Sequence, residues 1–313
     1  MSPALSSAAD VRDWIREETG AAEVEVRSLR NVASARTFLA RARGERLFVK
    51  LGPRTVAERE NLAGIRPPAA AESGISEVRF ADAEKQALAL RFEEGRSFLS
   101  ELVRRGHAAG ALLWGGRLRA DARRIGRCLA ALLAANGAGR RDVTAESVRA
   151  ARAQWEGVRR FFRPEEKARV GAWLGTLRLP PVALYRCSHD VSARNILLGP
   201  ARVTVVDWER VLERPAYYTL AYLSANIEAR ARLPGYRLNF MRRLSGELVA
   251  AFREAGVGEF DPGLYRVFRA LYLIEYVHGY ETKTGVFEPW EGDRPSMNRY
   301  IENIVRPDIL EVP

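Results

Sequence analysis

Apolar and polar residues alternate over two short segments in the first third of the chain, and three further short segments there also have strand-like patterns. A period of two places successive side chains on opposite faces of a strand, so these segments predict an antiparallel β-sheet. The predicted strands are 23–29, 36–43, 46–51, 75–80 and 86–92.

Two segments within this third have helical spacing instead. Residues 11–18 place Trp14 and Ile15 on one face and end before Gly20, and residues 56–65 form a second short helical pattern. The first third therefore predicts a small sheet accompanied by two helices.

The remainder of the chain is mostly helical in pattern. Apolar residues recur every three to four positions between residues 97 and 179, and the pattern returns after residue 209. The later predicted helices are 218–231, 239–255, 264–279 and 296–305. Between the two helical regions, segments 196–198 and 203–206 predict a β-hairpin with its turn at Gly199 and Pro200.

These patterns predict an α+β chain of two lobes. A chain of 313 residues is long enough for two lobes or domains, and no repeat or low-complexity linker interrupts it. We place the smaller, sheet-containing lobe at residues 1–94 and the larger, mostly helical lobe at residues 95–313.

Composition and charge narrow the class of protein. The net charge is +11, but the basic residues are dispersed among 39 acidic ones, which favours a solvated surface over a nucleic-acid site. The beginning of the sequence lacks signal-peptide features, no apolar run reaches membrane-spanning length, and the two cysteines have no metal-like spacing. We expect a cytoplasmic protein without a transmembrane segment. The pattern leaves the oligomeric state open.

The strongest chemical pattern lies around the predicted hairpin. Asp190 is followed five residues later by Asn195, and Asp207 comes directly after the second strand. The hairpin returns Asn195 and Asp207 to one edge, and carboxylate and amide oxygens are ligands that Mg²⁺ prefers. Phosphoryl transfer needs such positioning and charge neutralisation, so we expect Asp190 to meet a nucleophilic hydroxyl and the other two to hold metal. Each residue alone could simply cap a turn or end a strand, but the joint pattern favours the chemical interpretation.

With these residues the chain resembles the aminoglycoside phosphotransferase and choline kinase family. The family pattern is His-Gly-Asp-x-x-x-x-Asn, followed by two apolar residues and Asp-Phe/Trp-Glu. The resemblance implies a bilobal protein-kinase-like fold in which Asp190 is the catalytic residue, Asn195 and Asp207 are the metal ligands, and ATP and Mg²⁺ are the cofactors.

The chain departs from the family pattern at three positions. Ser188 and His189 stand where the pattern has His and Gly, and Thr219 stands where relatives have an Asp that braces the catalytic loop. We expect His189 to supply this brace through backbone carbonyls rather than to contact phosphate or acceptor.

Folds of this kind also use a strand lysine that contacts phosphates and a helix glutamate that orients it. Lys50 ends the predicted strand 46–51, and only four of the 50 basic residues are lysines, which makes its position notable. For its partner on the following helix, the pattern favours Glu60, with Glu58 second.

The resemblance implies two further nucleotide contacts. The loop 30–35 would cover the phosphates, and it contains no glycine, so Ser34 is the candidate for the β- or γ-phosphate. At the hinge between lobes, backbone groups of Arg91 and Glu93 would pair with the adenine edge, while Leu90 would help to bound an apolar slot.

Three functions compete on this sequence. The favoured one is an ATP-dependent phosphotransferase acting on a hydroxyl of a small molecule, such as an aminoglycoside-type antibiotic, an amino alcohol or a sugar. The alternatives are a catalytically diverged nucleotide-binding pseudokinase and a kinase of a larger acceptor such as a lipid-linked glycan. The joint presence of five residues argues against the pseudokinase: Lys50, Glu60, Asp190, Asn195 and Asp207.

Overall fold

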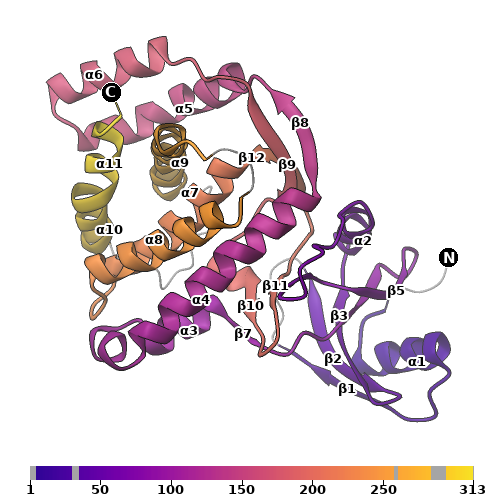
Figure 1. The fold of residues 1–313 in the computed structure, drawn as a ribbon. Helices are drawn as coiled ribbons and strands as arrows, with labels where there is room; N and C mark the ends of the chain where they lie inside the picture. The colour runs from indigo at the N-terminus through magenta and orange to yellow at the C-terminus, as the bar shows by residue number, and fades with distance from the viewer. Residues whose placement is uncertain (1–4, 30–34, 257–259, 283–293, 313) are drawn as a thin grey trace.

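The computed structural model describes residues 5–29, 35–256, 260–282 and 294–312. A five-stranded antiparallel sheet with two helices forms the N-terminal part, and a larger, mostly helical part follows (Figure 1). The structure thus has the α+β, two-lobed architecture that the sequence predicted. The elements of the N-terminal lobe are α1 (Ala8–Thr19), β1 (Val24–Ser28), β2 (Arg36–Ala42), β3 (Glu45–Leu51), α2 (Thr55–Ala63), β4 (Ser73–Ile75), β5 (Val78–Asp82) and β6 (Ala87–Arg91).

The N-terminal sheet has the strand order β1-β2-β3-β6-β5. Helix α1 begins at the Ser7 cap, whose side chain accepts a hydrogen bond from the Asp10 amide, and it ends at Gly20 with φ 62°. Trp14 and Ile15 are buried in a core that α1 shares with β2 and β3. This packing fixes β3, the strand that carries Lys50.

Helices make up most of the second lobe. Its elements are β7 (Arg96–Ser97), α3 (Phe98–Arg105), α4 (Ala108–Ala135), β8 (Gly137–Arg141), α5 (Thr144–Val158), α6 (Pro164–Thr176), β9 (Val182–Ser188), β10 (Ile196–Leu198), β11 (Val203–Val205), β12 (Val211–Pro215), α7 (Ala216–Glu228), α8 (Leu238–Glu254), α9 (Pro262–Thr282), α10 (Arg294–Tyr300) and α11 (Arg306–Leu310). Four short helical segments complete it: 3-10 turns at Arg159–Phe161, Ala193–Asn195 and Ala229–Arg232, and a π-helical turn at Ile301–Val305.

Helices α4 and α8 cross at very close range. A Cβ added at Gly126 of α4 would lie 2.2 Å from the backbone oxygen of Leu248 in α8. Only glycine permits this approach. Facing apolar residues such as Leu129 and Leu244 are fully buried there, so the contact organises the core behind the predicted hairpin.

The hairpin itself belongs to a small sheet with the order β4-β11-β10-β7. Strand β4 pairs in parallel with β11, and β7 pairs with β10, so the two segments that flank β5 and β6 in sequence meet the hairpin on both sides. The sequence predicted one strand over 75–80, whereas the structure divides this region into β4 and β5. The lobe boundary at residue 94 stays a prediction.

Candidate active site

Lys50 joins the two lobes through ion pairs. Its Nζ lies 2.7 Å from Glu58 Oε2 in α2 and 3.2 Å from Asp207 Oδ1, a residue 157 positions further along the chain. Burial alone would lower the pKa of Lys50, but the two carboxylates outweigh it and hold the pKa above its ordinary value. The lysine therefore stays charged at neutral pH.

The structure corrects the predicted partner of Lys50. Glu58, the second choice from the sequence, has a fully buried side chain, and its other oxygen accepts a 3.3 Å hydrogen bond from the Trp208 amide. Glu60 is exposed. Residues advance by about 100° round an α-helix, so two positions turn Glu60 to nearly the opposite side of α2.

The loop after β9 holds Asp190. Asn195 Nδ2 donates to the Asp190 backbone oxygen and to its Oδ2, both at 3.0 Å. The Tyr222 hydroxyl in α7 donates to Asp190 Oδ1. Both carboxylate oxygens of Asp190 therefore have a side-chain donor, which fixes the orientation of the group.

Asp207 adopts a backbone conformation that few residues with a side chain occupy. Its φ is 66°, in the left-handed region, where Asp and Asn are tolerated better than bulky residues. Its backbone oxygen accepts a 2.8 Å hydrogen bond from Ser188 Oγ, and its Oδ2 lies 3.4 Å from Asn195 Nδ2. Lys50, Asp190, Asn195 and Asp207, which the sequence singled out, are thus one connected cluster.

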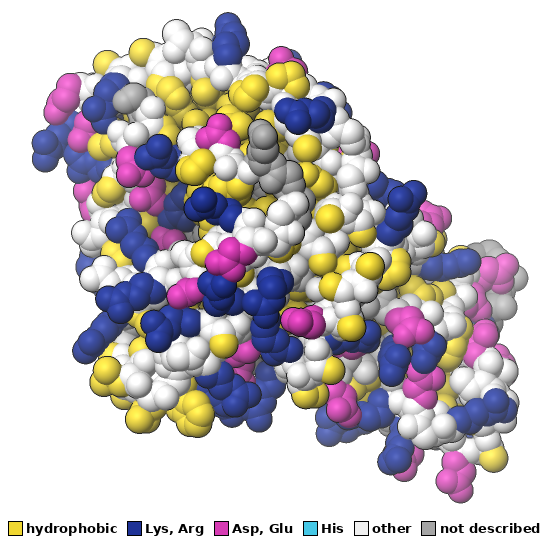
Figure 2. Space-filling model, viewed as in Figure 1, with side chains coloured by type: hydrophobic (Ala, Val, Ile, Leu, Met, Phe, Trp, Pro, Cys, Tyr) yellow, Lys and Arg dark blue, Asp and Glu magenta, His cyan; other side chains and the backbone are white. Residues whose placement is uncertain are grey.

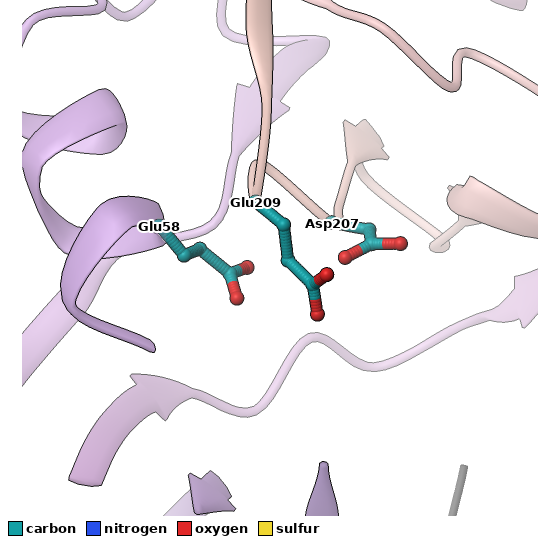
Figure 3. A group of neighbouring side chains, drawn as sticks. All are labelled: Glu58, Asp207 and Glu209. Atoms are coloured by element: carbon teal, nitrogen blue, oxygen red, sulfur yellow. The ribbon is translucent and has the colours of Figure 1, made fainter. Parts of the chain in front are cut away.

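Glu209 adds a carboxylate to which the sequence assigned no role. Ligand oxygens of Glu58, Asp207 and Glu209 all lie within 4.8 Å of one another (Figure 3). Glu209 also pairs with Arg54 at 3.1 Å and lies 4.0 Å from Lys50. The sequence signal that could have identified Glu209 is its position two residues after Asp207.

The residues present fit a hard divalent cation. Glu58 is buried and engaged by Lys50 and the Trp208 amide, whereas Asp207 and Glu209 are only partly buried, so the carboxylates of Asp207 and Glu209 are the better candidates for an ion. Because Asn195 Nδ2 already donates to Asp190, its amide oxygen is the atom left for a ligand bond. An all-oxygen donor set suits Mg²⁺.

The residues predicted to contact a nucleotide are Ser34, Leu90, Arg91 and Glu93. Ser34 lies outside the described residues. Leu90 is buried and belongs to the core, and the Arg91 amide donates to the Glu77 oxygen at 2.8 Å, so Arg91 could offer an adenine only its carbonyl. The Glu93 carboxylate pairs with Arg202 beside the hairpin turn. The roles of these residues toward a nucleotide stay predictions.

On the other side of Asp190, β12 and α7 present two residues that the sequence analysis missed, Arg214 and Tyr218. The Tyr218 hydroxyl donates to Glu275, and the Arg214 guanidinium lies 4.7 Å from the Tyr218 ring centroid. Burial raises the pKa of Glu275 and of Tyr222. Tyr218 and Tyr222 are four residues apart on α7, and this spacing is the only sequence signal for the cluster.

The brace of the catalytic loop differs from the expected one. The His189 imidazole makes no hydrogen bond with any other residue that the structure describes, and burial lowers its pKa despite the nearby Asp190. The loop is held instead through its backbone: Arg214 donates to the His189 oxygen at 3.2 Å, and Asn226 Oδ1 accepts from the Ala193 amide at 3.2 Å. Thr219 is buried. The expectation that the His189 side chain is the brace was wrong.

Comparison with known proteins places the fold. No family model and no curated protein sequence matches the chain. Among solved structures, it is similar to macrolide 2′-phosphotransferase from Brachybacterium faecium, with 17% identity, 94% of this chain and 98% of that chain covered, and a TM-score of 0.56.

Two further structures extend the comparison to other acceptors. A spectinomycin phosphotransferase, solved with ADP and spectinomycin, is 12% identical over 98% of this chain and 97% of its own, with a TM-score of 0.52. Choline kinase from Streptococcus pneumoniae is 14% identical over 97% and 99%, with a TM-score of 0.51. The chain has the protein-kinase-like fold of the aminoglycoside phosphotransferases and choline kinases, as its sequence predicted.

Proposed function

We propose that this protein transfers the γ-phosphate of ATP to a hydroxyl group of a small molecule. The observation that carries the proposal is the single cluster formed by Lys50, Asp207, Asn195 and Asp190, which come from both lobes and are linked by ion pairs and hydrogen bonds. A purely structural role would not require a buried lysine, two acids and an amide in one continuous network.

The nucleotide end of the cluster supplies positive charge and metal ligands. Lys50, oriented by Glu58, would contact the phosphates, while Asp207, Asn195 and Glu209 would hold Mg²⁺. The metal, when bound, neutralises the charge of the phosphate oxygens. The spectinomycin phosphotransferase of the same fold was solved with ADP, which supports a nucleotide at this end.

The acceptor end provides the base. Asp190 would accept the proton of the acceptor hydroxyl, and the hydrogen bonds from Asn195 and Tyr222 hold its carboxylate in place for that step. Tyr218, Glu275 and Arg214 lie on the same side and would contact the acceptor. An antibiotic, an amino alcohol or a sugar is the expected class.

Calorimetric titration tests the first half of the proposal. ATP should bind with Mg²⁺ present and more weakly without it. A protein that binds ATP under neither condition has another function.

A phosphate-transfer screen over antibiotics, amino alcohols and sugars tests the second half. At least one compound should be phosphorylated by the wild type and not by Asp190→Asn. ATP binding without transfer to any compound would favour the nucleotide-binding pseudokinase instead.

A further inference from the structure

Large exposed apolar side chains gather at one corner of the helical lobe. Leu112 and Leu113 are each 80% exposed, Val103 47% and Trp114 44%. Within the described ranges these four are the only large hydrophobic residues so exposed, and all lie where α3 ends and α4 begins. We call this group the apolar tip. Figure 2 shows yellow side chains at the corresponding lower-left corner, next to dark-blue basic ones.

The apolar tip is a built feature of the fold. His107 caps α4, with its Nδ1 accepting from the Gly110 amide at 3.2 Å, and the Tyr236 hydroxyl donates to the Val103 oxygen at 3.2 Å. The Arg105 guanidinium lies 4.7 Å from the Trp114 ring centroid. Apart from two glycines, the buried residues of α4 begin at Leu118, so the first two turns of the helix extend beyond the core. Their apolar side chains are therefore exposed to solvent instead of packing in the core.

Basic residues surround the apolar tip. Residues 96–127 contain eight arginines and two acidic residues, Glu101 and Asp121. Both acids are buried and already paired, Glu101 with Arg105 at 2.7 Å and Asp121 with Arg124 at 3.6 Å. The remaining charge is positive and outward: Arg117 and Arg119 are exposed and form no ion pair with any described residue.

A hollow of about 450 Å³ beside the apolar tip is also rich in basic residues. It lies between α3, α4 and the turn of the β10–β11 hairpin. Five arginines line it, together with the two buried acids Glu101 and Asp121: Arg96, Arg104, Arg105, Arg117 and Arg124. The corner thus combines projecting apolar groups with a concave surface rich in guanidinium groups, which match the geometry of phosphate oxygens.

We propose that this corner docks on the surface of an anionic phospholipid membrane, with the apolar tip inserted between the headgroups and the arginines on lipid phosphates. Shallow insertion of Leu and Trp combined with electrostatic attraction is how peripheral proteins bind such surfaces. A second copy of the chain fits less well, because a symmetric contact would bring the two sets of arginines together. The inference is independent of the proposed kinase activity, since no residue of the cluster around Asp190 takes part.

Vesicle co-sedimentation of the full chain tests this docking. Vesicles with about one third phosphatidylglycerol in phosphatidylcholine should carry the protein down, while pure phosphatidylcholine vesicles should leave it in solution. Leu112→Ser/Leu113→Ser should lower the partition coefficient at least about tenfold, because two inserted side chains are removed. Arg117→Gln/Arg119→Gln should lower it by about thirtyfold, or roughly fivefold for each charge.

Matched controls separate the corner from overall charge. Arg12→Gln/Arg149→Gln removes two exposed arginines elsewhere and should leave binding nearly unchanged. Thermal melting should show equal stability for all variants, since the substituted side chains are exposed. The blue shift of tryptophan emission on anionic vesicles should disappear in Trp114→Phe.

Three outcomes would overturn the proposal. These are equal sedimentation with neutral and anionic vesicles, equal loss of binding in the Arg12/Arg149 control, and no sedimentation at all. Sedimentation velocity tests whether a second copy of the chain occupies the corner instead. A wild-type dimer that Leu112→Ser/Leu113→Ser converts to a monomer, together with no vesicle binding, would assign the corner to that second copy.

Discussion

The two sides of the candidate site hold their charged groups in different ways. On the N-terminal side, Lys50 is buried and held by ion pairs to Glu58 and Asp207. On the C-terminal side, Asp190 is held by neutral donors, Asn195 and the Tyr222 hydroxyl. Because one of its ion pairs crosses between the lobes, the position of Lys50 depends on how the lobes are arranged. The contacts of Asp190 all lie within one lobe.

The two sides also differ in how closely their residues match the family pattern. Lys50, Asn195 and Asp207 stand at expected positions. Around Asp190, the expected His, Gly and Asp are replaced by Ser188, His189 and Thr219, and contacts from Arg214, Asn226 and Tyr222 hold the loop instead. If the proposed function holds, metal and phosphate would impose a fixed geometry on the first side, while the second side would be free to change with the acceptor.

Asp190→Asn should produce the largest effect. Loss of the base should lower kcat by about 10²- to 10⁴-fold, because proton transfer in the transition state contributes that much. ATP affinity should stay within about twofold, since Asp190 belongs to the acceptor side. Asp207→Ala is the comparison, and it should weaken Mg-ATP binding in calorimetry. Equal loss of ATP binding in both variants would contradict the division into two sides.

Glu58→Gln should both destabilise the fold and impair nucleotide use. Removing one partner of a buried ion pair costs about 3 kcal/mol, as urea unfolding would measure. The KM for ATP should rise because Lys50 loses its orienting partner. Glu60→Gln, on the same helix but exposed, should behave as the wild type. A large effect of Glu60→Gln with none from Glu58→Gln would restore the sequence-based assignment.

Tyr222→Phe should lower kcat about tenfold with little change in the KM for ATP. The substitution removes one hydroxyl and thus one of the two side-chain donors to Asp190. Tyr265→Phe is the matched control, because its hydroxyl donates to Ser224 of the same helix α7 at 3.1 Å and not to Asp190. If Tyr222 only supported the fold, stability would fall in step with kcat, and melting curves measured beside the kinetics would reveal it.

His189→Asn should give the smallest effect, a flatter dependence of stability on pH. Burial lowers the pKa of His189 in the folded state below its ordinary value near 6.5. The unfolded chain therefore takes up the proton first, and the wild type loses stability as pH falls below about 6.5. The loss should be small, because the side chain is partly exposed. Identical pH profiles of unfolding for both proteins would show that the imidazole does not titrate differently on folding.

Local patterns predicted the parts of the molecule that depend on local geometry. Strand-like patterns located β1, β2, β3 and β6, and the spacing from Asp190 to Asp207 placed three site residues around one hairpin. Glu58 and Glu60 could not be separated so easily, since α2 is short and weakly amphipathic and leaves the direction of each side chain to tertiary packing.

Other features depend on contacts between distant segments. Tyr222 meets Asp190 only because α7 packs behind the catalytic loop, 32 residues later in the chain. Strand β4 is three residues long and pairs with β11, so no alternating pattern could reveal it. The apolar tip was hidden within an ordinary helical pattern, because spacing does not show where a helix extends beyond its core.

The small sheet β4-β11-β10-β7 has a mechanical consequence. Strands from before and after β5 and β6 pair with the hairpin that lies between Asn195 and Asp207, so the N-terminal sheet is attached to it at two separate places. Two attachment points define a single axis, and we expect rotation about that axis to meet less resistance than motion in other directions. Opening and closing should then resemble a one-dimensional rocking motion about the hairpin, in which β1, at the far edge of the N-terminal sheet, moves most.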